Sequence, residues 1–170
     1  LARKGFLSGL VIDEHEDTPS SSAYRSRFGS LLRAYELVGY QPDRDYRYIE
    51  INRKLREAHP QIVADVIAGI ENAGGGAVQD SRTELLTING EFTVSVVLSR
   101  CFETAAGSLR WRIRLDTGLV PDITIAVRMD EANEAPRDYY VLPSIDMTFG
   151  KLKIAEQNGL ALDAYRFDTL

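Results

Sequence analysis

The acidic residues around one predicted hairpin have a spacing that could support metal-dependent hydrolysis. A metal-dependent nuclease needs carboxylates that converge on Mg²⁺, and commonly a lysine that activates the attacking water. One such arrangement has an acid on the first strand of a hairpin and an acid-x-Lys pair on one face of the second. Glu84 takes the first place, but Ser95 and Val97 stand where the acid and the lysine should be. The sequence therefore predicts no metal site and no catalysis, with a nuclease using Glu84 and displaced partners such as Glu91 or Asp80 as the alternative.

Other residues of nucleophilic or metal-binding type have no chemical partners near them in the sequence. Cys101 has no neighbouring histidine, so we expect a small buried side chain. His15 lies among acidic residues and His59 precedes Pro60 at a predicted helix end, and both are expected to be structural. The Ser20-Ser21-Ser22 cluster lacks a nucleophile elbow and is expected to begin a helix. We therefore predict no cofactor.

Positive charge without neighbouring acid marks a second kind of candidate site. From Thr18 to Tyr35 there are three arginines and no acid, although four acids lie just before, between Asp13 and Asp17. Arginines hold phosphates or guanine edges, and the early residues of a recognition helix reach base edges. We therefore predict contact with double-stranded DNA, with the acidic run pointing away from the phosphates. The candidate DNA-binding residues are Ser21, Ser22, Tyr24, Arg25, Arg27 and Arg33.

The composition limits the remaining function classes. The 170 residues are 44% hydrophobic and 26% charged, which is typical of a folded globular protein. A net charge of −5 argues against an extensive nucleic-acid coat but permits a local basic face. The single cysteine excludes an internal disulfide, and no apolar run approaches the ~18 residues of a membrane span. We expect a cytoplasmic protein with no membrane partner, leave self-association open, and expect a piece of a longer protein because the first residue is Leu.

The elements that must position these residues divide into two predicted domains. Residues 1–41 are predicted to form a small helix-turn-helix-like module. Residues 7–11 have the apolar spacing of one helical face. Thr18-Pro19-Ser20 restarts the chain at a second helix, and Ser30 can cap a third helix that stops at Gly39. The segment Gln41-Pro42-Asp43 is a predicted linker.

Residues 45–170 are predicted to form an α+β (or α/β) domain. Helices are expected over residues 51–59, ended by Pro60, over 61–73, and over 149–157 at the close of the domain. Asn89-Gly90 supplies the positive φ angles of a type I′ turn, so residues 84–99 should form a hairpin. Because the strands follow one another through short links, we expect a mostly antiparallel or mixed sheet flanked by helices.

Arginines alternate with apolar residues over positions 109–116. Trp111, Ile113 and Leu115 are predicted to face the core. The side chains expected to face outward are Arg110, Arg112 and Arg114. This segment therefore predicts a half-exposed strand with a basic outer face.

The arginine-bearing module resembles the homing-endonuclease-associated repeat, a small helical DNA-binding module. The resemblance rests on Pro19-Ser20, Tyr24, Arg27-Phe28-Gly29-Ser30 and the later Gly39, and it covers about a quarter of the chain. It implies that the helix over residues 20–28 faces DNA.

Nearly the whole chain also resembles the C-terminal region of bacterial site-specific recombinases of the serine type. The resemblance is carried by Tyr48-Ile49-Glu50-Ile51-Asn52, Pro121-Asp122-Ile123-Thr124 and Asp138-Tyr139-Tyr140-Val141-Leu142-Pro143, among other segments. In such proteins the catalytic serine lies in a separate N-terminal domain, so no catalytic residue is carried over. The resemblance implies a DNA-binding accessory region of a mobile-element recombinase.

The second domain is also similar in element order to the PD-(D/E)xK nuclease core. That similarity implies a restriction-endonuclease-like fold in which Glu84 takes the first metal-ligand place, while Ser95 and Val97 predict a catalytically inactive version. Three functions remain open. The first is the accessory region of a recombinase-like protein, the second is a PD-(D/E)xK endonuclease, and the third is a non-catalytic protein-interaction domain.

Overall fold

The computed structural model describes residues 7–15, 17–40, 47–115 and 118–170. The chain forms two compact units, Leu1–Glu50 and Ile51–Leu170. The predicted linker at residues 41–43 lies outside the described residues.

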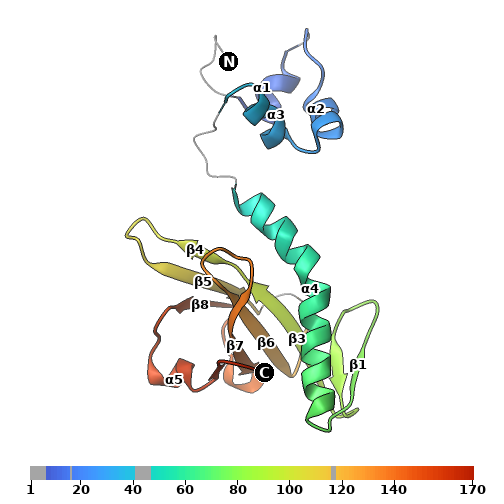
Figure 1. Ribbon diagram of the computed structural model, residues 1–170, viewed down its shortest axis with the longest axis vertical. Coiled ribbons are helices and arrows are strands. Elements are labelled where there is room, and N and C mark those ends of the chain that lie inside the picture. Colours follow the sequence, from blue (N-terminus) through green and yellow to red (C-terminus); the bar gives the residue numbers. More distant parts are fainter. Residues whose placement is uncertain (1–6, 16, 41–46, 116–117) are drawn as a thin grey trace. The chain divides into compact units, whose positions relative to one another are not determined.

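The N-terminal unit contains three short helices, each begun by a serine (Figure 1). They are α1 (Gly9–Asp13), α2 (Ser21–Phe28) and α3 (Leu31–Leu37). The hydroxyls of Ser8, Ser20 and Ser30 accept hydrogen bonds from the first turn of α1, α2 and α3 respectively, which satisfies backbone donors that a helix start leaves open. The predicted start of the second helix at Ser20 and the predicted cap at Ser30 are confirmed.

Two tyrosines connect the residue that precedes α1 with the end of α3. The ring of Tyr35 in α3 is buried and meets the ring of Tyr40 edge-on, with 5.4 Å between centroids. The hydroxyl of Tyr40 accepts a hydrogen bond from the backbone amide of Leu7 at 2.9 Å. The segment before α1 is therefore tied to the segment after α3.

One long helix, α4 (Arg47–Asn72), passes through Pro60, and from Ile51 onward it belongs to the second unit (Figure 1). The predicted helix end at Pro60 is therefore wrong. A proline inside a helix costs about 3 kcal/mol, because one backbone hydrogen bond is missing. Apolar side chains on both sides of Pro60 are buried, Leu55 and Ile62 among them. Burial of each such side chain stabilises the fold by about 1.5–3 kcal/mol, which offsets the cost of the proline. The continuous apolar face of the helix outweighs the local penalty.

A six-stranded sheet lies against α4, in the order β1-β2-β3-β6-β7-β9. Its strands are β1 (Ala77–Gln79), β2 (Leu86–Ile88), β3 (Phe92–Ser99), β6 (Ile123–Met129), β7 (Pro136–Pro143) and β9 (Arg166–Phe167). The pair β3–β6 is parallel and the other pairs are antiparallel. The sheet is thus mixed, which confirms the predicted α+β class with a mixed sheet.

The predicted hairpin turn is confirmed in its geometry. Asn89 and Gly90 have φ angles of 53° and 71°, and Ile88 pairs with Phe92 across the turn. Glu84, however, lies before β2 rather than on it, with a φ angle of 61°. Its backbone amide closes a turn by donating to the carbonyl of Asp80.

A second, three-stranded sheet consists of β4 (Cys101–Glu103), β5 (Leu109–Arg114) and β8 (Lys151–Ala155). The short helices η1 (Ser144–Asp146) and α5 (Leu160–Asp163) flank β8 in the sequence. The predicted closing helix over residues 149–157 is wrong, because β8 occupies its centre. Leu152 and Ile154 alternate with Lys151 and Lys153, which is the period of a strand.

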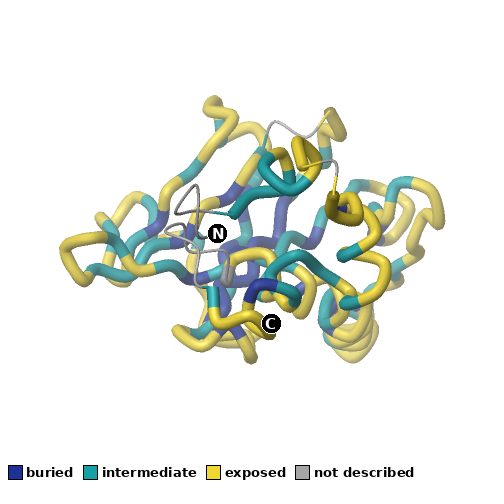
Figure 2. Tube along the Cα trace, turned by 90° about the horizontal axis from the view of Figure 1, so that it is seen from above, coloured by how far each residue is buried: buried dark blue, intermediate teal, exposed yellow. Residues whose placement is uncertain are grey.

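Two hydrophobic cores result from this layering. One lies between α4 and the first sheet, and the other lies between the inner face of the second sheet and the opposite side of the first. Most of the buried apolar residues belong to the strands. Figure 2 colours the chain by burial, with buried positions in dark blue and exposed positions in yellow. Alternate residues of β6 serve the two cores: Val127 packs toward α4 and Ala126 packs toward the second sheet.

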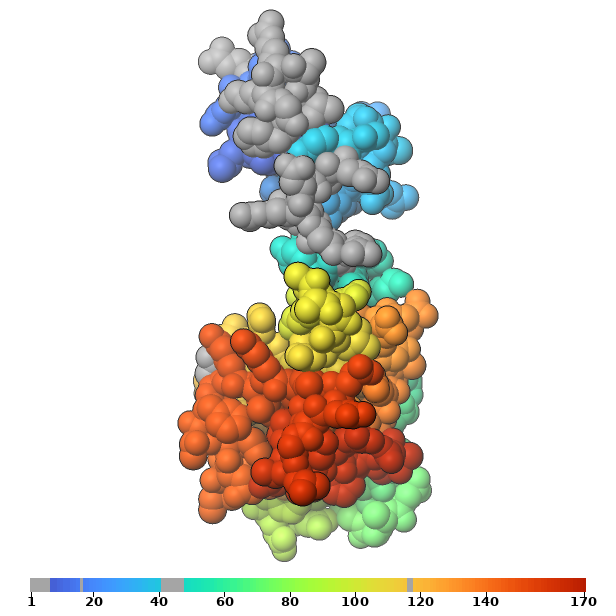
Figure 3. Space-filling model, turned by 90° about the vertical axis from the view of Figure 1, so that its left-hand side faces the viewer, coloured from blue at the N-terminus to red at the C-terminus, as the bar shows by residue number. Residues whose placement is uncertain are grey.

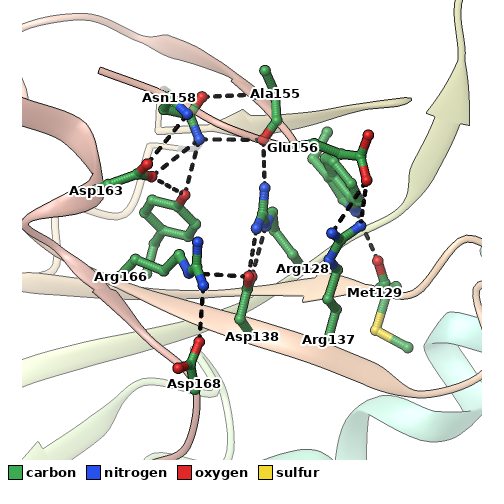
Figure 4. A network of polar contacts seen from close by, with 12 residues as sticks. Arg128, Met129, Arg137, Asp138, Ala155, Glu156, Asn158, Asp163, Arg166 and Asp168 are labelled. Carbon is green, nitrogen blue, oxygen red and sulfur yellow. Dashed lines mark hydrogen bonds and ion pairs between the residues drawn. The ribbon is translucent and has the colours of Figure 1, made fainter. Parts of the chain in front are cut away.

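An ion pair is buried on the side of the first sheet that faces the second core. Arg128 of β6 is 1% exposed, and its guanidinium donates to both carboxylate oxygens of Asp138 in β7, at 2.6 Å for the Nε contact. It also donates to the carbonyl of Ala155 at the end of β8 (Figure 4). Burial works against the charge of Arg128, but the hydrogen bonds with Asp138 raise its pKa.

Aromatic rings and further polar groups enclose this pair. The Arg128 guanidinium lies 4.5 Å from the ring centroid of Trp111 and 5.3 Å from that of Tyr140. The Tyr140 hydroxyl donates to Asp163 of α5. Burial raises the pKa of Tyr140 to about 12. Arg166 of β9 approaches Asp138 at 3.4 Å.

Trp111 is fully buried, as predicted, and its indole N–H donates to the carbonyl of Met129 at 2.8 Å. We expect Trp111→Ala to lower the free energy of unfolding by about 3–5 kcal/mol, since it opens a cavity and removes this hydrogen bond. Trp111→Phe, which keeps a ring beside Arg128, should cost less. Chemical denaturation of both variants measures the difference, and a loss under roughly 1 kcal/mol for Trp111→Ala would contradict the core role.

The ion pair predicts strong coupling between its two members. Asp138→Leu leaves a buried arginine without its main partner and should destabilise the protein by about 3–5 kcal/mol. The other single change, Arg128→Met, leaves the buried Asp138 without its main partner. The double variant Arg128→Met, Asp138→Leu removes both charges and should be destabilised by less than the sum of the single changes. A denaturation cycle over the four proteins tests this, and additive effects would show that the pair is not coupled.

Candidate nucleic-acid interface

The exposed side chains of α2 and α3 include most of the predicted DNA-binding residues. Ser22, Arg25 and Arg27 are exposed on α2, and Arg33 is exposed on the first turn of α3. Tyr24 is half-buried, and its ring stacks on that of Phe28 with 6.3 Å between centroids. These residues share one small unit.

Ser21 is the exception and lacks the exposure that a DNA contact requires. It is 4% exposed, and both its amide and its hydroxyl donate to the Asp13 carboxylate, at 2.6 and 2.8 Å. The prediction that Ser21 contacts DNA is therefore corrected: the residue joins α1 to α2. A serine at a helix start offers two hydrogen-bond donors, its amide and its hydroxyl, and the Asp13 carboxylate accepts from both.

Asp13, the first residue of the acidic run, lies against the start of α2. Its carboxylate lies at the first turn of α2, where helix amides and the helix dipole favour negative charge. The hydrogen bonds from the Ser21 amide and hydroxyl lower the pKa of Asp13, and the charge of Arg25 lowers it further. The start of α2 is therefore already occupied by an acid of the same chain.

The two arginines of α2 have different surroundings. The Arg25 guanidinium lies close to α1, because a Cβ placed on Gly9 would be 3.2 Å from it. Arg27 lies over the ring of Phe28, 6.0 Å from its centroid. Among the described residues, no ion pair joins Arg25 or Arg27 to an acid within 4.0 Å, and both side chains are exposed to solvent.

The carboxylates considered for metal binding do not converge. Among the described residues, no group of three or more His, Cys, Asp or Glu side chains could hold a metal ion. Asp80 is occupied by the turn that follows it, since its carboxylate accepts hydrogen bonds from the amides of Arg82 and Thr83 and from the Thr83 hydroxyl. These hydrogen bonds lower the pKa of Asp80, and the bond from the Thr83 amide has the largest effect.

Cys101 and the histidines lie in separate places. Cys101 is buried, burial raises the pKa of its thiol, and its backbone exchanges hydrogen bonds with the side chain of Asn133. His59, just before Pro60, contacts the carbonyl of Val96 at 3.1 Å and so joins α4 to β3. His15 lines an apolar cavity of about 280 Å³ between the N-terminal helices.

A second basic surface lies on the second sheet, and the candidate residues taken from the sequence do not include it. Strands β5 and β8 pair in register, with Arg112 opposite Lys153 and Arg114 opposite Lys151. We call this surface the basic outer face, defined by Arg110, Arg112, Arg114, Lys151 and Lys153. The sequence predicted the arginine half from its alternation, but missed the lysine half because residues 149–157 were expected to be helical. Figure 3 views the second unit from the side on which the β4–β5 hairpin, in yellow, projects.

Comparisons with known proteins give one structural likeness. No protein-family model matches the chain, and no curated protein matches it. A solved structure described as a bacterial homing endonuclease, I-Ssp6803I, is similar with a TM-score of 0.40 and 18% identity, over 59% of this chain and 78% of that one. A likeness of this degree establishes no shared activity. The restriction-endonuclease-like assignment of the second unit stays a prediction.

The described part of the chain contains no helix with the length and apolar character needed to cross a membrane.

The dispersed carboxylates predict that divalent metal does not bind. Calorimetric titration of the protein with Mg²⁺ or Mn²⁺ should show no saturable heat, and the melting temperature should not change. Glu84→Ala should behave like the unmodified protein in both measurements. Metal-dependent plasmid cleavage that disappears in Glu84→Ala would contradict this and support the nuclease alternative.

Proposed function

We propose that this chain is a DNA-binding accessory region of a mobile-element, recombinase-like protein, with its DNA contact on α2 and α3. The observation that carries the proposal is the exposure of Arg25, Arg27 and Arg33 on two adjacent helices in a stretch without acid. The resemblances to the homing-endonuclease-associated repeat and to recombinase C-terminal regions support the same role. The partner is double-stranded DNA, and this role requires no catalysis within the chain.

The Asp13 carboxylate at the start of α2 limits where DNA phosphates can contact this helix. Phosphates often bind the free amides at a helix N-terminus, but Asp13 holds the Ser21 amide and adds a negative charge there. Phosphates are therefore expected at the other end of α2, near Arg25 and Arg27. Ser22 and Tyr24 lie one turn closer to the start and are the residues available for base edges.

A protein-interaction module is the second candidate, and apolar exposure favours it. Leu10, Leu37 and Val38 of the N-terminal unit are 66–77% exposed. Exposed apolar side chains on a small unit are a common feature of protein contacts. In this alternative the arginines are only solvated and the unit binds another protein.

Removal of the α2 arginines tests the proposal. Arg25→Ala, Arg27→Ala should weaken binding to mixed-sequence duplex DNA. The slope of log affinity against log salt should become smaller by about one unit for each phosphate that the variant no longer neutralises. The measurement is fluorescence anisotropy at several salt concentrations.

The matched control is Arg56→Ala, Arg82→Ala, which removes the same charge from exposed positions of the second unit. It should change binding less than the α2 variant does. Equal effects of the two variants, or no binding of the unmodified protein at low salt, would refute DNA recognition by α2.

A further inference from the structure

The basic outer face gathers positive charge in a unit that is otherwise acidic. Residues 45–170 contain 14 basic and 19 acidic residues, and five of the basic ones lie in strands β5 and β8, which contain no acid. Trp111, Ile113 and Ile154 are fully buried beneath them. The strand alternation therefore directs the arginines and lysines of both strands to the opposite, outer face.

The cross-strand register concentrates this charge further. Arg112 lies opposite Lys153, and Arg114 lies opposite Lys151. Like charges directly opposite one another in a sheet are destabilising. The Arg112–Lys153 pair is therefore unfavourable for the free protein, and an anion beside it would relieve the repulsion.

Several of these cations are available to a ligand. Arg112, Lys151 and Lys153 are exposed, and within the described ranges no carboxylate forms an ion pair with any of them. The guanidinium of Arg112 lies 5.5 Å from the ring centroid of Phe102 on the neighbouring strand, which orients it. By contrast, the buried Arg128 and the Glu156-paired Arg137 have partners within the protein.

The spacing of the cations suits a ligand that carries negative charges at regular intervals. Residues two apart on a strand are separated by about 6.8 Å, and neighbouring strands by about 4.8 Å. The positive charges of this face are therefore spaced regularly in two directions. A single carboxylate could contact only one or two of them. A nucleic-acid backbone presents phosphates at regular intervals and can neutralise several at once.

We propose that the basic outer face binds the sugar–phosphate backbone of double-stranded DNA. Two neighbouring strands can enter the ~12 Å wide major groove of B-DNA, where their cations reach the phosphates on either side. The deep, narrow major groove of duplex RNA does not admit side chains in this way. An anionic membrane is a poorer fit, because the outward-facing positions of β5 and β8 carry basic side chains and Ala155, with no large apolar side chain to enter the acyl region. This contact does not depend on the α2 arginines, so the chain has two separate DNA-binding surfaces.

The test uses the full chain and five proteins. These are the unmodified protein, Arg112→Ala with Lys153→Ala on the basic outer face, Arg25→Ala with Arg27→Ala on α2, the combination of all four changes, and a control. The control, Arg56→Ala with Arg82→Ala, removes two exposed arginines that lie outside β5 and β8. Affinity for a 20-base-pair mixed-sequence DNA duplex is measured by fluorescence anisotropy between 50 and 300 mM salt, with duplex RNA of the same sequence in parallel.

We expect the basic-outer-face variant to bind DNA about tenfold more weakly at low salt, with a salt slope about two units smaller, while the control changes little. An unchanged affinity and slope would overturn the proposal, as would an equal decrease in the control. Equally tight binding to duplex RNA that disappears in the same variant would overturn the assignment to DNA. If only the α2 variant binds more weakly, the basic outer face is not a DNA site, and if only the basic-outer-face variant does, α2 is not.

A charge reversal separates binding from folding. Lys153→Glu places an acid opposite Arg112 and replaces a repulsive pair with an attractive one. The melting temperature should rise or stay constant while DNA affinity falls. A variant that melts lower and binds DNA as tightly as the unmodified protein would overturn the proposal.

Discussion

The buried ion pair between Arg128 and Asp138 is the interaction on which the second unit depends. A charged arginine inside a protein is stable only when its hydrogen bonds and its charge are compensated together. Asp138 of β7 compensates the charge, the Ala155 carbonyl at the end of β8 accepts a further hydrogen bond, and the Trp111 ring of β5 covers the guanidinium. Strands from both sheets therefore meet at one side chain. The position of the second sheet against the first follows from this requirement.

The basic outer face is a consequence of that fixed inner face. Because Trp111 and Ile113 point into the second core, the alternation of β5 leaves its arginines on the outside. Pairing of β8 with β5 then brings Lys151 and Lys153 beside them. The same packing that satisfies the buried charge thus gathers the exposed ones, which links the stability of the unit to its proposed contact with DNA.

In the N-terminal unit an acidic side chain is bonded within the chain, and the arginines of α2 stay exposed. Asp13 and Ser21 connect α1 to α2 across a helix start, so the donors best suited to an anion are used within the chain. Arg25 and Arg27 remain exposed toward the end of α2. Taken together, the two units hold positive charge on a short helix and on a sheet face, within a chain whose net charge is negative.

The sequence by itself determined the features that depend on neighbouring residues. The serine caps of α2 and α3, the Asn89-Gly90 turn and the alternation that buries Trp111 were predicted because each is decided by a few residues and their local geometry. Tertiary structure decided the rest. The helix α4 continues through Pro60 because it packs on a sheet formed by residues far along the chain, and β8 is a strand because β5 offers it a partner. For the same reason only the structure shows that Ser21 is bonded to Asp13, and that two lysines lie opposite two arginines, since both contacts join residues that the spacing of the sequence does not connect.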